Sequence, residues 1–585
     1  MKIKSLIINN KLLFIILFIA ALLRLWNLGS IPPSLSPDEA AIGYNAYSIL
    51  KTAKDEHNQL LPIVFKSFGD YKPGLYIYTT VPFVLIFGLN EWSVRLSSAI
   101  AGIMAVWLIY LLTNELKSYE LRVTGSKNIT YNPITRNFQT RLIAAFLLAI
   151  NPWHIYFSRG AWEANLSLTL TLFGIYFFLK ALNKHKYLLL SAISLALTLL
   201  TYQGAKLSSV IVIFLLLIVF WPEFKKILSN NFVTVLQSII LSVAIVMPIL
   251  ISLFTGKIGR LEVFSVFSYP RENVSLQTFL AQGNEKVGDI KYIIYHSESL
   301  NFARGILERW YNHFSGKFLL FAGDWSNPRH SAPNQGMFLL IDLVLLPLGL
   351  ILVLKNKPNK FSIFFIAWLV LAPLPAILSR NQVHAVRSLN MIIPLTLISS
   401  MGFSYLLLFV SSIKRYLLRI TSFLLLAIIF ICSLVYFFDA YFVHLPAHDA
   451  ILWDYGYKEM VKSVVPVQDN YAKVFVQQSY DQPYIYFLFY GSQLDSQRYD
   501  PRRYQMREKL VESSFGDVGL VEDLDNISFQ EYNFPQVSEI RPILVVGDSN
   551  RISDDYEKYG FNLIKEIKYP GNVDTAFYIL DKVNE

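Results

Sequence analysis

Residues 11–50 read KLLFIILFIAALLRLWNLGSIPPSLSPDEAAIGYNAYSIL, an apolar run that passes directly into a more polar loop. A helix that spans a bilayer needs about 20 mostly apolar residues, and residues 11–28 meet this requirement. No clear cleavage site of small residues follows, so we expect a retained anchor rather than a signal peptide. The stretch therefore predicts an integral membrane protein whose first loop begins near residue 29.

The whole chain has the composition of a membrane protein. Of its 585 residues, 54% are hydrophobic and 16% are charged, whereas soluble proteins carry about 25% charged residues. The net charge of +10 comes from basic residues scattered between apolar runs, which argues against nucleic-acid binding. Cys432 is the only cysteine and lies in an apolar run, so no intrachain disulfide can form.

Eleven windows, the first included, are apolar enough to cross a membrane, so we predict a polytopic α-helical membrane protein with about 11 transmembrane helices. The windows are 11–28, 92–116, 139–157, 164–182, 187–203, 205–221, 233–254, 336–354, 361–378, 388–410 and 415–437. Residues 73–89 (PGLYIYTTVPFVLIFGL) are ambiguous, because this stretch is short, aromatic and interrupted by proline.

The distribution of charge settles the ambiguous stretch. If residues 73–89 do not cross and the N-terminus is inside, the inside segments hold nineteen Lys and Arg residues, against four in three short outside loops. A crossing at 73–89 would invert every later loop and reverse this bias. Because basic residues gather in cytoplasmic loops, we expect eleven spans, with residues 73–89 along the outer surface.

This topology predicts two domains. Residues 1–440 form the transmembrane domain, with outer loops at 29–91 and 255–335. Residues 441–585 form a small soluble α/β domain on the extracytoplasmic side. Its strands are expected at 472–477, 542–547 and 575–581, where β-branched and aromatic residues cluster, and a polar helix at 552–559.

The first loop carries the sharpest chemical signal. Pro37, Asp38 and Glu39 open a helical pattern, as Pro and acidic residues do in a first turn. Ile42, Tyr44 and the residues that follow give this helix an apolar face that could lie on the membrane. Asp38 either caps the helix or serves as a general base just above the lipid surface.

Lys72, which immediately precedes the aromatic stretch 73–89, has two interpretations. A long basic side chain in such a place often anchors a segment at the membrane interface. As a compact cation, it could instead bind the phosphate of a lipid.

Short outside loops supply further candidates. Arg159 and Glu163 lie in the loop 158–165, where they pair with each other or line a polar cavity. Arg380, His384 and Arg387 lie in the loop 379–387, where they anchor to headgroups or bind phosphate.

In the longer loop, residues 323–330 (GDWSNPRH) form a polar and aromatic cluster that includes Asp324. This cluster either recognises a sugar or an acceptor, or forms turns.

The order of these motifs resembles the C-type membrane glycosyltransferases, which share the GT-C fold. The nearest branch is the superfamily of aminoarabinose (lipid A) transferases and protein O-mannosyltransferases. The resemblance covers roughly residues 10–250 well and continues more loosely to the last span. It is carried by the first span, Pro37-Asp38-Glu39, Lys72-Pro73, the segment 94–102 and Arg159 with Glu163.

The resemblance implies roles for particular residues. Asp38 matches the catalytic acid, and Lys72 matches the residue that contacts the donor phosphate. Glu163 stands where the family more often has Asp, in a loop that faces the active cavity. Arg387 falls near a basic position of the family that precedes a proline-containing span. One of Arg380 or Arg387 would help Lys72 to stabilise the charge on the donor phosphate. Glu39, Arg159, His384 and Asp324 are candidate substrate contacts.

The resemblance also implies amphipathic helices on the outer surface within the first loop, and a plasma membrane location. The expected reaction is inverting transfer of a sugar from a polyprenyl-phosphate donor to a hydroxyl of a protein, lipid or polysaccharide. Asp38 would be the base, and no metal or other cofactor would be required.

Three alternatives to this reaction remain open. A transporter would place its ionisable residues near the bilayer midplane, in repeated halves, and a non-catalytic scaffold would lack a cavity beside Asp38. An oligosaccharyltransferase that uses lipid pyrophosphate often needs a metal, so sensitivity to chelators would identify it.

Overall fold

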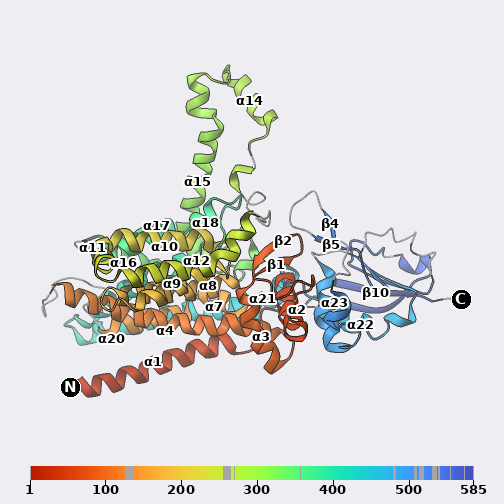
Figure 1. Ribbon diagram of the computed structural model, residues 1–585, viewed down its shortest axis with the longest axis horizontal. Coiled ribbons are helices and arrows are strands. Elements are labelled where there is room, and N and C mark those ends of the chain that lie inside the picture. Colours follow the sequence, from red (N-terminus) through yellow and green to blue (C-terminus); the bar gives the residue numbers. More distant parts are fainter. Residues whose placement is uncertain are drawn as a thin grey trace.

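The structure is a computed structural model, in which a long bundle of helices carries a smaller α/β unit at one end (Figure 1). It describes residues 2–583 except 125–137, 255–264, 269, 356–357, 478–481, 506–509, 513–518, 530–536, 538–540, 554 and 572–573. Part of the predicted loop 255–335 therefore lies outside the described residues, as do Lys127, Arg136 and Lys357 among the predicted inside cations.

Each of the eleven predicted windows coincides with helix in the structure. The bundle helices are α1 (Lys2–Leu25), α4 (Glu91–Thr124), α6 (Phe138–Ile150), α7 (Pro152–Arg159), α8 (Glu163–Ala181), α9 (Tyr187–Leu199), α10 (Ala205–Val219), α11 (Trp221–Asn230), α12 (Phe232–Phe254), α16 (Asp342–Lys355), α17 (Lys360–Leu371), α18 (Leu374–Ile377), α19 (Ile392–Ser411) and α20 (Tyr416–Asp439).

The described helices support a multi-pass membrane protein. By length and composition, six of them could cross a membrane, or up to seven if α10 and α11, bent by 84° at their junction, form one broken span. The total of eleven spans stays a prediction. Close packing in the bundle uses small residues: a Cβ on Gly349 of α16 would lie 2.0 Å from the Ile398 carbonyl oxygen of α19.

The first loop forms a compact unit at one end of the bundle. It contains α2 (Pro37–Thr52), the hairpin of β1 (Val64–Ser67) and β2 (Asp70–Pro73), and α3 (Leu75–Phe87). The 13 residues of α3 reach only about 20 Å, less than the hydrocarbon core of about 30 Å. Its buried face includes Tyr76 and Thr80, whereas Leu85 and Ile86 are exposed. These features support the prediction that residues 73–89 lie along a surface without crossing.

The tail contains a mixed sheet of strand order β6-β7-β3-β8-β10-β9, in which β3 is parallel to β7 and β8 and β10 is antiparallel to β8 and β9. The strands are β3 (Lys473–Val476), β6 (Asp523–Leu524), β7 (Ile527–Ser528), β8 (Ile543–Gly547), β9 (Asn562–Lys568) and β10 (Thr575–Lys582). A separate short hairpin pairs β4 (Leu510–Glu512) with β5 (Gly519–Val521). The helices of the tail are α21 (Leu445–His448), α22 (Tyr457–Val464), α23 (Pro483–Leu494) and α24 (Pro501–Tyr504).

The three predicted strands of the tail are confirmed as β3, β8 and β10. The predicted helix at 552–559 is wrong in extent, because the described part holds only a 3-10 turn at Tyr556–Tyr559. Whether the tail is a separate soluble domain with a boundary at residue 440 stays a prediction.

The apolar face of α2 lies against the tail, not on a bare membrane surface as its sequence suggested. One hydrophobic core contains Ala40, Tyr44 and Ile49 from α2 together with Tyr486 and Phe489 from α23. Tyr486 also donates a hydrogen bond to the carbonyl oxygen of Leu35 (3.0 Å), and Tyr484 donates one to Glu56 (3.3 Å). The first loop and the tail therefore pack as one unit.

We expect Gly43→Ala to destabilise this shared core. A Cβ at position 43 would lie 2.5 Å from a ring carbon of Phe489 and 2.6 Å from a methyl of Val94, and overpacking of this kind costs about 1–3 kcal/mol. Ala favours a helix over Gly by about 1 kcal/mol. Any loss of stability in this variant would therefore come from the clash and not from helix propensity. The measurement is the thermal unfolding midpoint in detergent.

Gly29→Ala is the control for this experiment, because its Cβ would meet Trp92 at an ordinary 3.7 Å. A Gly43→Ala protein as stable as this control would contradict the close packing of α2 on α23.

Candidate active site at one end of the bundle

Asp38 lies at the start of α2, in a first turn that the sequence fixes locally. The backbone N–H of Glu39 donates to Ser36 Oγ (3.3 Å), and the N–H of Ser36 donates back to Glu39 Oε2 (3.1 Å). This reciprocal capping box, with Pro37 in the first position, sets where the helix begins. The Asp38 side chain is left 48% exposed, so its carboxylate can be reached from outside.

Lys72 meets Asp38 across the loop, because its ammonium donates to Asp38 Oδ1. Lys72 stands on β2, opposite Phe65 of β1, and its side chain is only 12% exposed. Its ammonium also lies 5.8 Å from the centre of the Phe68 ring. Two motifs that the sequence placed 34 residues apart are thus in direct contact, and Lys72 is directed at the carboxylate, unlike a simple interfacial anchor.

Glu39, a predicted substrate contact, has a structural role instead. Its carboxylate is buried and accepts hydrogen bonds from Arg95 Nε (3.0 Å), Arg95 Nη2 (3.1 Å) and the backbone N–H of Ala161 (2.8 Å). With the bond from Ser36, both oxygens have protein donors. Glu39 therefore ties the start of α2 to α4 and to the loop 160–162, and no free acceptor faces a substrate.

Arg95 extends this tie into the loop before α2. Its remaining N–H groups donate to the carbonyl oxygens of Leu28 (3.0 Å), Pro32 (3.0 Å) and Ser34. The side chain is fully buried. Its guanidinium therefore holds both the loop before α2 and Glu39 in the first turn of α2. This role could not be predicted from the sequence, because Arg95 lies 56 residues from Glu39.

Arg159 holds the same loop from the other side. Its buried guanidinium donates to the carbonyl oxygens of Leu23 (2.8 Å), Ile31 (3.1 Å) and Asn27 (3.5 Å). It also lies 5.1 Å from the ring centre of Phe442. Arg159 therefore braces this loop through its two Nη atoms, and the predicted substrate contact through Arg159 stays a prediction.

Glu163 begins α8, where an acid suits the positive end of the helix dipole. It is half-buried and follows Ala161, whose N–H bonds Glu39. The structure thus places Glu163 at the same end of the bundle as Asp38.

A buried cluster of Asp324, His330 and His384 joins two further loops. One potential ligand atom from each residue lies within 4.8 Å of the others. Asp324 accepts hydrogen bonds from the N–H of Ala385 (2.7 Å), from the N–H of Asn327 (2.9 Å) and from His330 Nδ1 (2.9 Å). Asp324 and His330 are six residues apart, but His384 lies in a different loop, which is why no metal-ligand spacing was visible in the sequence.

A carboxylate with two neutral imidazoles is a donor set that zinc can accept. Burial lowers the pKa of His330 despite the Asp324 carboxylate, and burial followed by the Arg387 guanidinium lowers the pKa of His384 well below its usual range. However, Asp324 already accepts several N–H groups, and the nearby Arg387 cation disfavours a metal ion. The hydrogen bonds of the cluster brace the loop 323–331 against the loop 379–387.

The His330 ring packs on Trp162 with a centroid separation of 5.4 Å. This contact links the buried cluster to the loop 160–162 and so to the start of α2. Arg387 is half-buried near His384, whereas Arg380 is exposed. Of the two arginines predicted to bind phosphate, Arg387 is thus the one integrated with this cluster.

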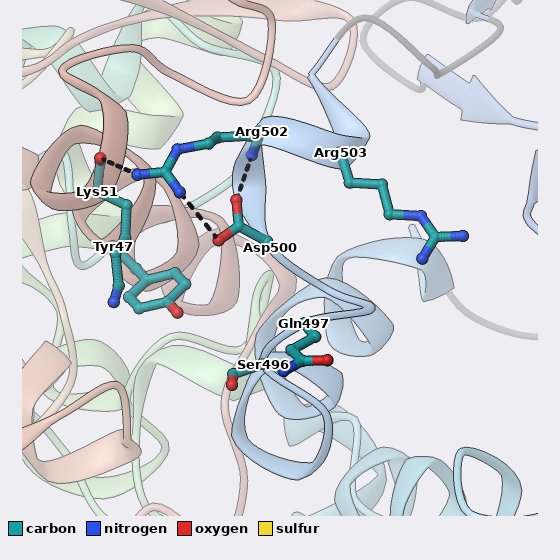
Figure 2. Close-up of a pocket in the computed structure, with 7 residues that line it drawn as sticks. All are labelled: Tyr47, Lys51, Ser496, Gln497, Asp500, Arg502 and Arg503. Atoms are coloured by element: carbon teal, nitrogen blue, oxygen red, sulfur yellow. Dashed lines mark hydrogen bonds and ion pairs between the residues drawn. The ribbon is translucent and has the colours of Figure 1, made fainter.

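The other end of α2 borders an open pocket of about 560 Å³ between the first loop and the tail (Figure 2). Tyr47 and Lys51 line it from α2, and Asp500 and Arg502 line it from the tail. The Arg502 guanidinium lies 3.8 Å from the Asp500 carboxylate and donates to the Lys51 carbonyl oxygen (3.5 Å). These contacts add to the attachment of the tail along α2.

Comparison with known proteins supports a common fold. Residues 14–124 match the family described as dolichyl-phosphate-mannose-protein mannosyltransferase. A search of curated protein sequences gives no match.

Among solved structures, ArnT from Cupriavidus metallidurans in the apo state aligns with a TM-score of 0.51 at 10% identity, over 99% of this chain and 98% of that chain. The same protein bound to undecaprenyl phosphate aligns with a TM-score of 0.51 at 11% identity, over 100% and 98%. The Archaeoglobus fulgidus oligosaccharyltransferase in the apo form gives a TM-score of 0.44 at 13% identity, over 82% and 63%.

The predicted resemblance to the C-type membrane glycosyltransferases is confirmed, by the family match at the N-terminal part and by the ArnT-like fold of the whole chain. At identities this low, the structural likeness establishes the fold alone.

We expect Glu39→Gln to destabilise the protein by about 3–5 kcal/mol, because it leaves the buried Arg95 guanidinium without its countercharge. The free energy of unfolding, measured in detergent with a denaturant, tests this. Glu459→Gln makes the same change in an exposed pair with Lys462 (3.0 Å) and should stay within about 0.5 kcal/mol of wild type. Equal stability of the two variants would show that the buried pair does not hold the first loop.

Proposed function

We propose that this chain, which has the GT-C fold, is an inverting glycosyltransferase that acts on the outer face of the membrane. It would move a sugar from a polyprenyl-phosphate donor to an acceptor hydroxyl, with Asp38 as the general base. The observation that carries the proposal is the exposed Asp38 carboxylate held beside the mostly buried Lys72 at one end of the bundle. A base and a cation stand together there, on a scaffold shared with ArnT.

Asp38 takes the proton of the acceptor hydroxyl as its oxygen forms a bond to the anomeric carbon. The bond from that carbon to the phosphate oxygen breaks on the opposite side, so the configuration inverts. The brace around Glu39 favours this role, because a base must be held in a fixed position relative to the reacting hydroxyl. Glu163, at the same end of the bundle, orients the acceptor.

Lys72 stabilises the charge that grows on the departing phosphate, and Arg387 or Arg380 adds to it. The named substrate of the matching family, dolichyl-phosphate-mannose, and the undecaprenyl phosphate bound to ArnT both support a polyprenyl-phosphate carrier. The Lys72 ammonium donates a hydrogen bond to Asp38. Donor binding would then place Lys72 between two anions.

One carboxylate suffices for this reaction. The lipid phosphate leaves as a monoester anion and needs no proton, in contrast to the paired acids of sugar hydrolysis. No step requires a metal ion, and the hydrogen bonds of Asp324 agree with a structural role for the Asp324–His330–His384 cluster.

We expect Asp38→Asn to lower the rate of sugar transfer at least about 100-fold, because a positioned base contributes about that much or more. Purified protein with a radiolabelled polyprenyl-phosphate sugar gives the measurement. Asp469→Asn makes the same change at a side chain that is 77% exposed in the tail and should leave the rate unchanged. Transfer by Asp38→Asn near the wild-type rate would refute the assignment of the base.

Lys72→Ala should raise the apparent KM for the donor about 10-fold or more, because a hydrogen bond to a charged group contributes about 1.5–3 kcal/mol. Lys66→Ala is the matched control, because Lys66 lies in the same hairpin, opposite Tyr71. An unchanged donor KM combined with a lower kcat would show that Lys72 acts on Asp38 and not on the donor phosphate.

A further inference from the structure

A helical hairpin of α14 (Asn273–Gly283) and α15 (Glu298–Phe314) projects from the body of the protein. In Figure 1 the bundle helices run horizontally, and α15 runs across them, away from the bundle. Its last turns are fixed to the bundle: Trp310 Nε1 donates to the Val370 carbonyl oxygen near the end of α17 (3.0 Å), and Asn312 donates to Gln382 (3.1 Å). The hairpin thus leaves at the bundle end that carries the loop 379–387 and Asp38.

The apolar side chains of α15 gather on one side of the helix, which also carries Ser299 and the buried His313. With 100° between successive residues, its apolar side chains fill one arc of about 180°. Arg304 and Arg309 stand at the two edges of this arc, and Glu308 and Asn312 lie opposite. The residues of the arc are Leu300, Phe302, Ala303, Ile306, Leu307, Trp310, Tyr311 and Phe314.

Part of this arc has no protein cover among the described residues. Leu307 and Tyr311 are each 67% exposed, although the Phe302 ring packs on Phe267 with a centroid separation of 5.3 Å. At the tip, Val287 and Ile290 are 70% and 76% exposed, and Ile294, in the turn before α15, is 52% exposed. Apolar side chains exposed together along a hairpin mark a surface that water does not normally cover.

We propose that the α14–α15 hairpin lies on the membrane, with its apolar arc in the boundary between headgroups and acyl chains at the Asp38 end of the bundle. Its direction across the span helices (Figure 1) is the direction of the bilayer plane, and the hydrogen bond from Asn312 to Gln382 of the outer loop 379–387 sets its base at the outer end of the bundle. Tyr and Trp prefer this boundary. Arg304, at one edge of the arc, is exposed, as is typical of interfacial helices, because a long basic side chain can lie along the lipid while its charge reaches water.

A second protein is the competing occupant. A second protein could cover the apolar arc whatever the direction of α15. A membrane explains both the direction of α15 across the span helices and its position at the end of the bundle. The inference does not depend on the glycosyltransferase reaction, so it stands even if Asp38 has no catalytic role.

The test labels cysteines introduced into the hairpin. Cys432, the only native cysteine, is exposed on α20 and is therefore replaced first. In a Cys432→Ala background, Leu307→Cys and Ile294→Cys place a fluorescent label on the apolar arc and at the apolar tip. Glu308→Cys is the matched control, one residue from Leu307 but outside the apolar arc. The labelled full-length proteins are reconstituted into phosphatidylethanolamine and phosphatidylglycerol vesicles that contain lipids with a nitroxide near the headgroup.

We expect lipid nitroxides to quench the labels at positions 307 and 294 at least about twofold more than the label at 308, and aqueous iodide to show the opposite order. Equal iodide quenching at all three positions would overturn the proposal, because the hairpin would then stand in water. Protection of position 307 from both quenchers would also overturn it, in favour of a protein contact. Variants are compared only when they elute as the wild type does in size-exclusion chromatography.

Discussion

The buried ion pair of Glu39 and Arg95 fixes the part of the molecule on which the candidate site depends. Glu39 closes the capping box of α2, receives the Ala161 N–H and binds a guanidinium that also holds the carbonyl oxygens of Leu28 and Pro32. Ion pairs of this kind add little net stability over an apolar core, but their directional bonds specify one geometry. Here that geometry sets the direction in which the neighbouring Asp38 leaves the helix.

The division of labour between Asp38 and Glu39 illustrates how adjacent acids can differ. On a helix, successive side chains are about 100° apart, so one faces the interior when the other faces outward. Glu39 is buried among donors, whereas Asp38 keeps half of its surface and contacts Lys72. A polar pair in the sequence is thus separated into a structural acid and an accessible one by the rotation of the first turn.

Much of the architecture could be predicted because it follows from local patterns. Apolar windows gave the helices, the charge bias predicted that residues 73–89 do not cross, and short β-branched runs gave three strands of the tail. The contacts of Arg95, Arg159 and Asp324 could not be predicted in the same way. Their partners are main-chain atoms or side chains distant in the sequence. The order of residue types does not show which carbonyl oxygen a buried side chain will reach. For that reason Glu39 was expected to face substrate, although it is a buried brace.

The shared core of α2 and the tail has a consequence for how the protein is made. Residues 37–52 leave the ribosome more than 400 residues before Tyr457, Tyr486 and Phe577, which complete the core around them. Throughout that interval the apolar side of α2 lacks its native cover. Helix α2 therefore reaches its final packing only after these residues of the tail have been synthesised, and a chain that stops before them would leave its apolar side uncovered.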